Sequence, residues 1–220
     1  MVSGSQRLLI FDCDGVLVDS EPTSNRVLAD AISAVGLPMN PDQVANCFEG
    51  MRLTDIQARV EAQLGRALPE GWLAAFEAER VAAFEESLDP VPGVEEVLAA
   101  AAAKGTPMCV ASQARREKMV LTLHLTGLSR FFPETTLFSS TMVEQGKPHP
   151  ALFLLAAAGM GFDPTRCIVI EDGVLGVVAG LAAGMRVLGF APAPSKAARL
   201  SERGAEVFAS MTEIPALLDL

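Results

Sequence analysis

The sequence contains no tyrosine, 1 tryptophan and only 2 histidines, and aromatic residues make up 5% of its 220 positions. Its core must therefore be packed mainly with aliphatic side chains and alanine, and a hydrophobic content of 50% is enough for a substantial core. Acidic residues exceed basic ones by 27 to 17, for a net charge of -10. The sequence thus lacks the excess of Lys and Arg that a nucleic-acid surface needs. An anionic small molecule is still possible, because a metal ion and a few local cations can reverse the potential within one cleft.

Cysteine pairs and long apolar runs are missing too. The 4 cysteines are far apart and include no C-x-x-C pair: Cys13, Cys47, Cys109 and Cys167. This spacing indicates neither a zinc site nor a redox motif, so we expect reduced, mostly buried thiols. Residues 1–7 show no apolar segment typical of a signal peptide, and the apolar stretch 173–185 is shorter than the roughly 20 residues that span a bilayer. We expect a cytoplasmic protein that binds no membrane, and no protein partner is implied.

The hydrophobic pattern alternates between short apolar strands and helices over most of the chain. Strands are expected at residues 7–11, 108–111, 137–138, 167–170, 187–190 and 207–208, and helices at 94–104, 116–123, 151–158 and 175–183. Alternation of this kind implies an α/β fold, a Rossmann-like parallel sheet with helices on both faces.

Residues 22–87 interrupt that alternation with a helical pattern. Apolar side chains recur there at helical spacing, and no strand pattern is visible. Prolines and a glycine at 90–93 mark the return to alternating strands and helices. We therefore predict an all-helical cap domain, residues 18–87, inserted into an α/β core domain made of residues 1–17 and 88–220.

Two acidic residues, Asp12 and Asp14, directly follow the first apolar strand in the stretch FDCDGVLVDS. In an extended segment their side chains share one side, and the carboxyl edge of a parallel sheet is the usual ligand crevice. Two carboxylates about 4 Å apart repel each other by about 4 kcal/mol at an effective dielectric constant of about 20, which a divalent cation offsets. Oxygen ligands without a nearby histidine favour Mg²⁺. The competing interpretation is an acidic turn at Asp14-Gly15, with Asp19 capping a helix.

Further polar residues stand where predicted strands end or helices begin. Ser112 ends the apolar stretch CVAS, and Lys147 lies in the rigid stretch GKPHP. Glu171 and Asp172 directly follow the apolar run IVI. Taken singly, Ser112 and Asp172 can cap the helices that follow, and Lys147 can be a solvated surface charge. Capping explains the acidic pair poorly, because burying two carboxylates without a cation would be costly.

In this order, the motifs resemble those of the haloacid dehalogenase-like hydrolase superfamily, in the helical-cap branch that includes sugar-phosphate phosphatases and β-phosphoglucomutase. The resemblance spans essentially the whole chain. It implies that Asp12 attacks phosphorus to form an aspartyl phosphate, and that Asp14 exchanges protons with the leaving group and then with water. It also implies that Ser112 and Lys147 stabilise the phosphoryl oxygens. The implied ligands of Mg²⁺ are Asp12, the backbone carbonyl of Asp14, Asp172 and, directly or through water, Glu171.

Substrate contacts are expected from both domains. Candidates in the core are the backbone N–H groups near Cys13 and Gly15, and the side chains of Gln113, Arg115 and Arg116. Candidates in the cap are Glu21, Asn25, Gly50, Arg52 and Arg80. For Arg52 and Arg80, a solvated helix charge is the preferred interpretation. Cap opening would be hinged near residues 18–22 and 88–91.

The remaining glycine and histidine patterns suggest packing more than chemistry. The glycines at 173, 176, 180 and 184 do not form G-x-G-x-x-G, so we expect them to let a helix pack closely on the sheet. His124 and His149 are interpreted as surface or packing residues.

Several activities remain open at this point. A dehalogenase releases halide, which needs no proton, and dehalogenases of this superfamily lack an acid at the position of Asp14. A phosphosugar mutase shares the core chemistry and differs only in its acceptor, a sugar hydroxyl in place of water. A catalytically silent binding module would have no reason to keep this charge arrangement. We expect a phosphatase that acts on a small phosphorylated metabolite, a sugar or sugar-acid phosphate such as 6-phosphogluconate.

Overall fold

The computed structural model describes residues 6–48 and 51–220. Its sheet has 6 strands in the order β3-β2-β1-β4-β5-β6, and every neighbouring pair is parallel. The strands are β1 (Leu8–Phe11), β2 (Met108–Ser112), β3 (Leu137–Ser139), β4 (Cys167–Glu171), β5 (Arg186–Phe190) and β6 (Glu206–Phe208). The chain moves outward from β1 to β3 and then returns beside β1 to form β4. This reversal places a topological switch point at the carboxyl ends of β1 and β4, where open α/β sheets bind ligands.

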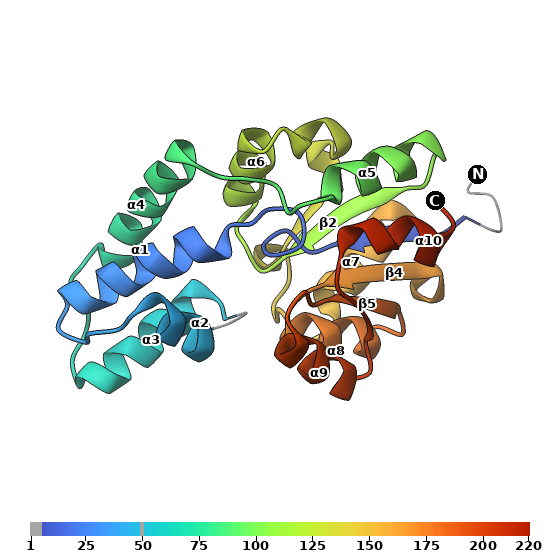
Figure 1. Ribbon diagram of the computed structural model, residues 1–220. Helices are drawn as coiled ribbons and strands as arrows, with labels where there is room; N and C mark the ends of the chain where they lie inside the picture. The colour runs from blue at the N-terminus through green and yellow to red at the C-terminus, as the bar shows by residue number, and fades with distance from the viewer. Residues whose placement is uncertain (1–5, 49–50) are drawn as a thin grey trace. The chain divides into compact units, whose positions relative to one another are not determined.

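Helices cover both faces of the sheet, as predicted. They are α5 (Val94–Ala103), α6 (Arg116–Leu125), α7 (Ala151–Met160), α8 (Val174–Ala182), α9 (Pro194–Glu202) and α10 (Ile214–Leu218). Figure 1 shows α5 and α10 on one side of the sheet and α8 and α9 on the other. Successive side chains of β1 point alternately toward these two layers of helices. Leu8 and Ile10 join a buried cluster with residues of α7, α8 and α9, whereas the ring of Phe11 meets Phe132 edge-on at 6.1 Å.

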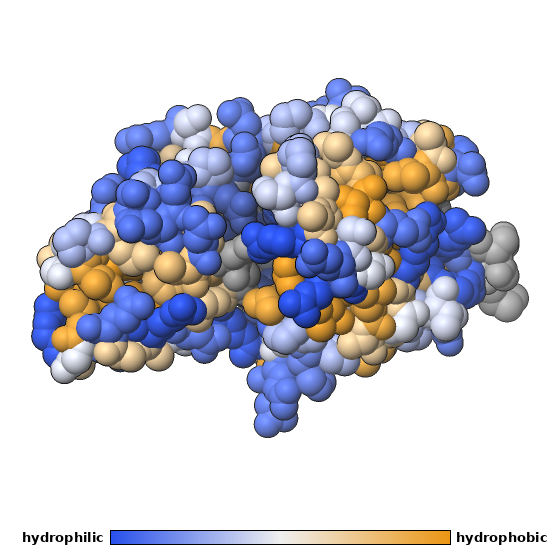
Figure 2. Space-filling view, turned by 60° about the horizontal axis from the view of Figure 1, so that its bottom comes forward, coloured by the Kyte–Doolittle hydropathy of each residue, from blue (hydrophilic) through white to orange (hydrophobic). Residues whose placement is uncertain are grey.

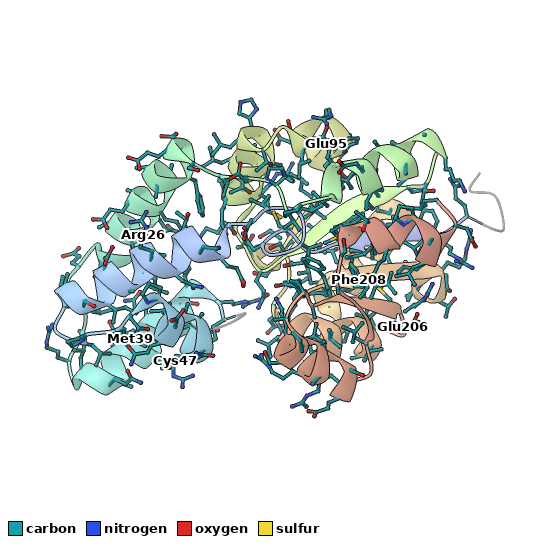
Figure 3. The ribbon with its side chains drawn as sticks, viewed as in Figure 1. Arg26, Met39, Cys47, Glu95, Glu206 and Phe208 are labelled. Carbon is teal, nitrogen blue, oxygen red and sulfur yellow. The ribbon has the colours of Figure 1, made fainter. Side chains whose placement is uncertain are left out.

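The edge strand β6 is short, and side-chain contacts anchor it to β5. Phe208 packs against Phe190, with ring centroids 5.4 Å apart. Glu206 accepts hydrogen bonds from Nε and Nη2 of Arg186 at 2.8 and 2.6 Å. Glu206 and Phe208 are labelled in Figure 3. These contacts explain how a strand that the sequence marks with only two apolar residues completes the sheet.

The chain divides into two compact units, Met1–Val18 with Pro90–Leu220 and Asp19–Asp89. The second unit, which carries the labelled residues Arg26, Met39 and Cys47 in Figure 3, is helical. Its helices are α1 (Glu21–Ala34), α2 (Pro41–Phe48), α3 (Leu53–Leu64) and α4 (Trp72–Glu86). It has its own hydrophobic core, in which the rings of Trp72 and Phe76 stack.

The sequence interpretation missed two helices of the α/β unit. In α9 a single residue, Leu200, is buried, so its apolar periodicity is too weak to recognise. The other, α10, has only 5 residues. Packing against the sheet or against α5, more than a local sequence pattern, determines that these two segments are helical.

Within the described part of the chain, no helix has the length and hydropathy that crossing a membrane requires. Figure 2 shows hydrophilic and hydrophobic side chains interspersed on one face. All four cysteines are free thiols, and all except the half-buried Cys47 are buried. A cytoplasmic location stays a prediction.

Candidate active site

The turn after β1 places Asp12 beside the end of β4. The pairing of Phe11 with Ile170 continues one step further, because the Asp12 N–H donates to the Ile170 carbonyl at 2.9 Å. Gly15 follows in the left-handed region, with φ 75°, and a Cβ there would overlap the carboxylate of Asp172. Two distant segments therefore meet closely at this edge, and only glycine satisfies both the backbone angle and the space.

Lys147 lies between two buried carboxylates. Its Nζ contacts Asp12 Oδ1 at 2.7 Å and Glu171 Oε1 at 2.5 Å, and its side chain is 3% exposed. Burial lowers the pKa of Lys147, but the attraction of both carboxylates outweighs this and raises it overall. The main chain of Lys147 is held by Gln113, whose amide accepts from its N–H at 3.2 Å and donates to its carbonyl at 3.3 Å. Gln113, predicted to contact substrate, thus uses its amide to fix Lys147.

Both carboxylate oxygens of Glu171 accept hydrogen bonds. Its Oε1 accepts from Lys147, and its Oε2 accepts from the N–H groups of Asp172 and Gly173, both at 3.0 Å. Gly176 in α8 leaves space for this carboxylate, since a Cβ at that position would overlap it. Glu171 therefore positions Lys147 as well as adding negative charge. As predicted, Gly176 lets α8 pack closely on the sheet, and the side chain that it accommodates is the carboxylate of Glu171.

The space at Gly176 leads to a stability prediction. Gly176→Ala should lower the free energy of unfolding by about 1–2 kcal/mol, because overpacking against a fixed carboxylate outweighs the helix propensity of alanine. Gly173→Ala is the matched control, since a Cβ there meets Glu171 only at an ordinary 3.6 Å. Urea unfolding of both variants measures the difference. Equal stability of the two would show that the Glu171 carboxylate is free to move.

The acidic residues form a group suited to a cation. Ligand oxygens of Asp12, Glu171 and Asp172 lie within 4.8 Å of one another, and all three residues are buried. The pKa of Asp12 is raised to about 7, because burial and the negative charges of Glu171 and Asp14 together outweigh the lowering effect of Lys147. Three buried carboxylates with oxygen atoms this close together form a donor set that fits a hard divalent cation.

Sequence reasoning missed two lysines at this site. Lys118 Nζ contacts Asp14 Oδ1 at 2.6 Å, and Lys196 Nζ contacts Asp172 Oδ2 at 2.5 Å. Lys118 belongs to the first turn of α6, directly after the Ser112 loop, and its place beside a motif was the available signal. For Lys196 there was no signal, because the helix that carries it was not predicted.

The other core candidates are spread between the site and the surface. Ser112 is buried at the end of β2, and its hydroxyl accepts from the Ala114 N–H at 3.2 Å, which leaves its own proton for another acceptor. Cys13 is buried, and burial raises its pKa, so its thiol stays protonated. The Arg116 guanidinium contacts Glu134 Oε2 at 3.2 Å on the surface. Arg115, His124 and His149 are exposed.

The candidates in the helical unit differ in exposure. Glu21 is exposed, and Asn25 and Arg52 are half-buried. Gly50 lies outside the described residues. Arg80 is only 8% exposed, and its guanidinium lies over the ring of Phe76 at 5.0 Å. The interpretation of Arg80 as a solvated charge is therefore wrong, because α4 places this side chain against Phe76 and away from solvent.

Comparison with known proteins places the chain in a family. The sequence matches the haloacid dehalogenase-like hydrolase profile over residues 6–184. The chain belongs to this family. It is 33% identical to the 6-phosphogluconate phosphatase of Escherichia coli K12 over 187 residues, which covers 84% of this chain and 83% of that one. The match confirms the predicted hydrolase class.

Solved structures agree with the family. A HAD family hydrolase from Deinococcus radiodurans R1, with bound phosphate and sodium, superposes with a TM-score of 0.78 at 34% identity and covers 99% of this chain and 97% of its own. A candidate β-phosphoglucomutase from Thermotoga maritima gives 0.79 at 25% identity, covering 97% and 99%. The hydrolase thus resembles sugar-phosphate phosphatases and β-phosphoglucomutase-like proteins, as its motifs predicted.

Proposed function

We propose that this hydrolase is a Mg²⁺-dependent phosphatase that cleaves small phosphomonoesters through an aspartyl phosphate on Asp12. The observation that carries this proposal is the buried group of Asp12, Lys147, Glu171 and Asp172 at the switch point of the sheet. A nucleophilic carboxylate, a buried ammonium and a cation-binding acidic pair are what phosphoryl transfer from a dianion requires.

The residues divide the chemistry among them. Asp12, Asp172 and the backbone carbonyl of Asp14 would hold Mg²⁺, which supplies positive charge against the incoming phosphoryl group. An oxygen of Asp12 attacks phosphorus, and the bond to the leaving oxygen breaks. Asp14 gives that oxygen its proton, then takes one from the water that attacks the aspartyl phosphate and frees Asp12. Lys147 neutralises charge on the transferred group.

Ser112 and the main chain complete this arrangement. The buried Ser112 hydroxyl donates its remaining proton to a phosphoryl oxygen, with the N–H groups near Cys13 and Gly15 as further donors. The presence of Asp14 favours an ester over a carbon–halogen bond, because an alkoxide needs a proton to leave and a halide does not.

The relatives support a phosphorylated sugar or sugar acid as the substrate, with either water or a sugar hydroxyl as the acceptor. The 6-phosphogluconate phosphatase favours a sugar-acid phosphate, and the Deinococcus structure with phosphate favours an anion at the site. The β-phosphoglucomutase-like neighbour supports a second candidate, a phosphosugar mutase, in which a sugar hydroxyl replaces water. We assign the helical unit the role of a cap that selects between these acceptors.

A substrate screen tests the proposal. Purified protein is incubated with sugar phosphates and sugar-acid phosphates, and released phosphate and isomerised ester are measured together. We expect phosphate release with Mg²⁺, with a sugar-acid phosphate among the best substrates, and loss of at least about 100-fold after EDTA, as expected when a metal supplies several kcal/mol of charge stabilisation. Isomerisation without release would establish the mutase instead. Equal activity with EDTA would contradict the metal requirement.

A further inference from the structure

Lys196 reaches a buried carboxylate from the rim of the site. It is the third residue of α9, and its Nζ contacts Asp172 Oδ2 at 2.5 Å. The Asp172 side chain is 7% exposed, whereas that of Lys196 is 23% exposed. The ammonium is thus at a buried oxygen while part of the side chain meets solvent.

The buried acidic group is divided between two lysines. Lys147 contacts Asp12 and Glu171, and Lys196 contacts Asp172. Each carboxylate of the group that could hold a cation therefore already faces an ammonium. A divalent ion that enters this group must either share Asp172 with Lys196 or displace Lys196 from it.

We propose that Lys196 is a positioning residue that holds Asp172 in the metal-free protein and competes with Mg²⁺ for it, so that it sets the metal concentration at which the site fills. This inference rests on the proposed function, because it takes Asp172 as a ligand of Mg²⁺. Two cations on one buried carboxylate repel each other strongly. Lys196 can yield, because its partly exposed stem lets the ammonium turn to water, whereas the side chain of Lys147 is 3% exposed.

Calorimetric titration of Mg²⁺ into the full-length protein at fixed ionic strength tests this competition. For Lys196→Gln we expect the Kd for Mg²⁺ to fall about fivefold, as removal of a competing, partly exposed ion pair implies. Lys196→Arg keeps the charge and should stay within about twofold of the wild type. Lys104→Gln is the matched control for net charge, because Lys104 is exposed at the end of α5. An unchanged or higher Kd for Mg²⁺ in Lys196→Gln would overturn the inference.

A second measurement uses only the wild-type protein, so its outcome does not depend on whether a variant folds. Lysines are acylated with a limiting reagent, with and without Mg²⁺, and peptides are quantified by mass spectrometry. Modification of Lys196 should rise severalfold with Mg²⁺, while that of Lys104 stays constant. No rise at Lys196 would overturn the competition. If the wild type binds no Mg²⁺ at all, the proposed metal-dependent function fails as well, whereas binding without a change at Lys196 removes only this inference.

Discussion

Asp12→Asn is expected to reduce phosphate release by about 10⁴-fold or more, because an amide oxygen is a poor nucleophile and cannot form the aspartyl phosphate. The measurement is released phosphate at saturating Mg²⁺ with the best ester from the screen. Asp30→Asn is a matched control, since Asp30 is an exposed helix residue whose side chain is 72% exposed, and it should retain full activity. Activity of Asp12→Asn within tenfold of the wild type would mean that another group attacks phosphorus.

Unfolding of the Asp12→Asn variant is not expected to explain its loss of activity. Burial raises the pKa of Asp12 to about 7. A carboxyl group whose pKa is raised by folding favours the native state at low pH, and this contribution is lost as the pH rises through that value. At pH 8 without metal, the ionised Asp12 therefore costs stability, and asparagine removes this cost. Asp12→Asn should melt no lower than the wild type at pH 8 without Mg²⁺, and it should lose most of the rise in Tm that Mg²⁺ gives the wild type.

Lys147→Met is expected to cost about 3–5 kcal/mol of unfolding free energy at pH 8 without metal, in addition to most of the activity, because breaking a buried ion pair leaves uncompensated charge. Lys147 contacts two buried carboxylates, so both Asp12 and Glu171 lose their ammonium partner. Urea unfolding measures the cost. Lys104→Met, at an exposed position where the ammonium donates to the Asp219 carbonyl, should cost no more than about 1 kcal/mol.

The cost of Lys147→Met should also depend on pH. In the wild type, burial raises the pKa of Asp12 to about 7 although Lys147 lowers it, so removal of Lys147 raises this pKa further. Between pH 6 and pH 8 the wild type can release this proton, whereas the variant must keep it or carry an unpaired buried charge. The variant should therefore be destabilised less at pH 6 than at pH 8. A cost that is small and equal at both pH values would contradict the account of Lys147 as the counter-charge of this buried group.

The motif residues were predictable because each stands next to a strongly patterned element. Asp12, Ser112 and Glu171 directly follow or end apolar strands, and parallel strands bring their carboxyl ends to one edge. Lys147 was identified from its resemblance to a family motif, supported by its rigid local sequence. What these residues contact was not predictable, since Gln113 was named only as a substrate contact and its hydrogen bonds to the main chain of Lys147 were not anticipated.

Contacts that depend on tertiary packing escaped prediction for a different reason. Gly15 and Gly176 matter because a side chain from elsewhere fills the space where their Cβ would be, and no local pattern records that. Arg80 was taken for a solvated charge because periodicity does not tell how deeply a helix face packs. Lys196 lies on a helix with one buried residue, so neither the helix nor its contact with Asp172 could be anticipated.

The sequence by itself determined the α/β class, the strands and most of the helices, and the carboxylates and lysine of the candidate site, because periodicity and strand-end position are local properties. Only the tertiary structure decided which ammonium faces which carboxylate. Pairings of Lys118 with Asp14 and of Lys196 with Asp172 join residues 104 and 24 positions apart. Coulomb interaction depends on distance in space, and that distance exists only once the sheet has formed.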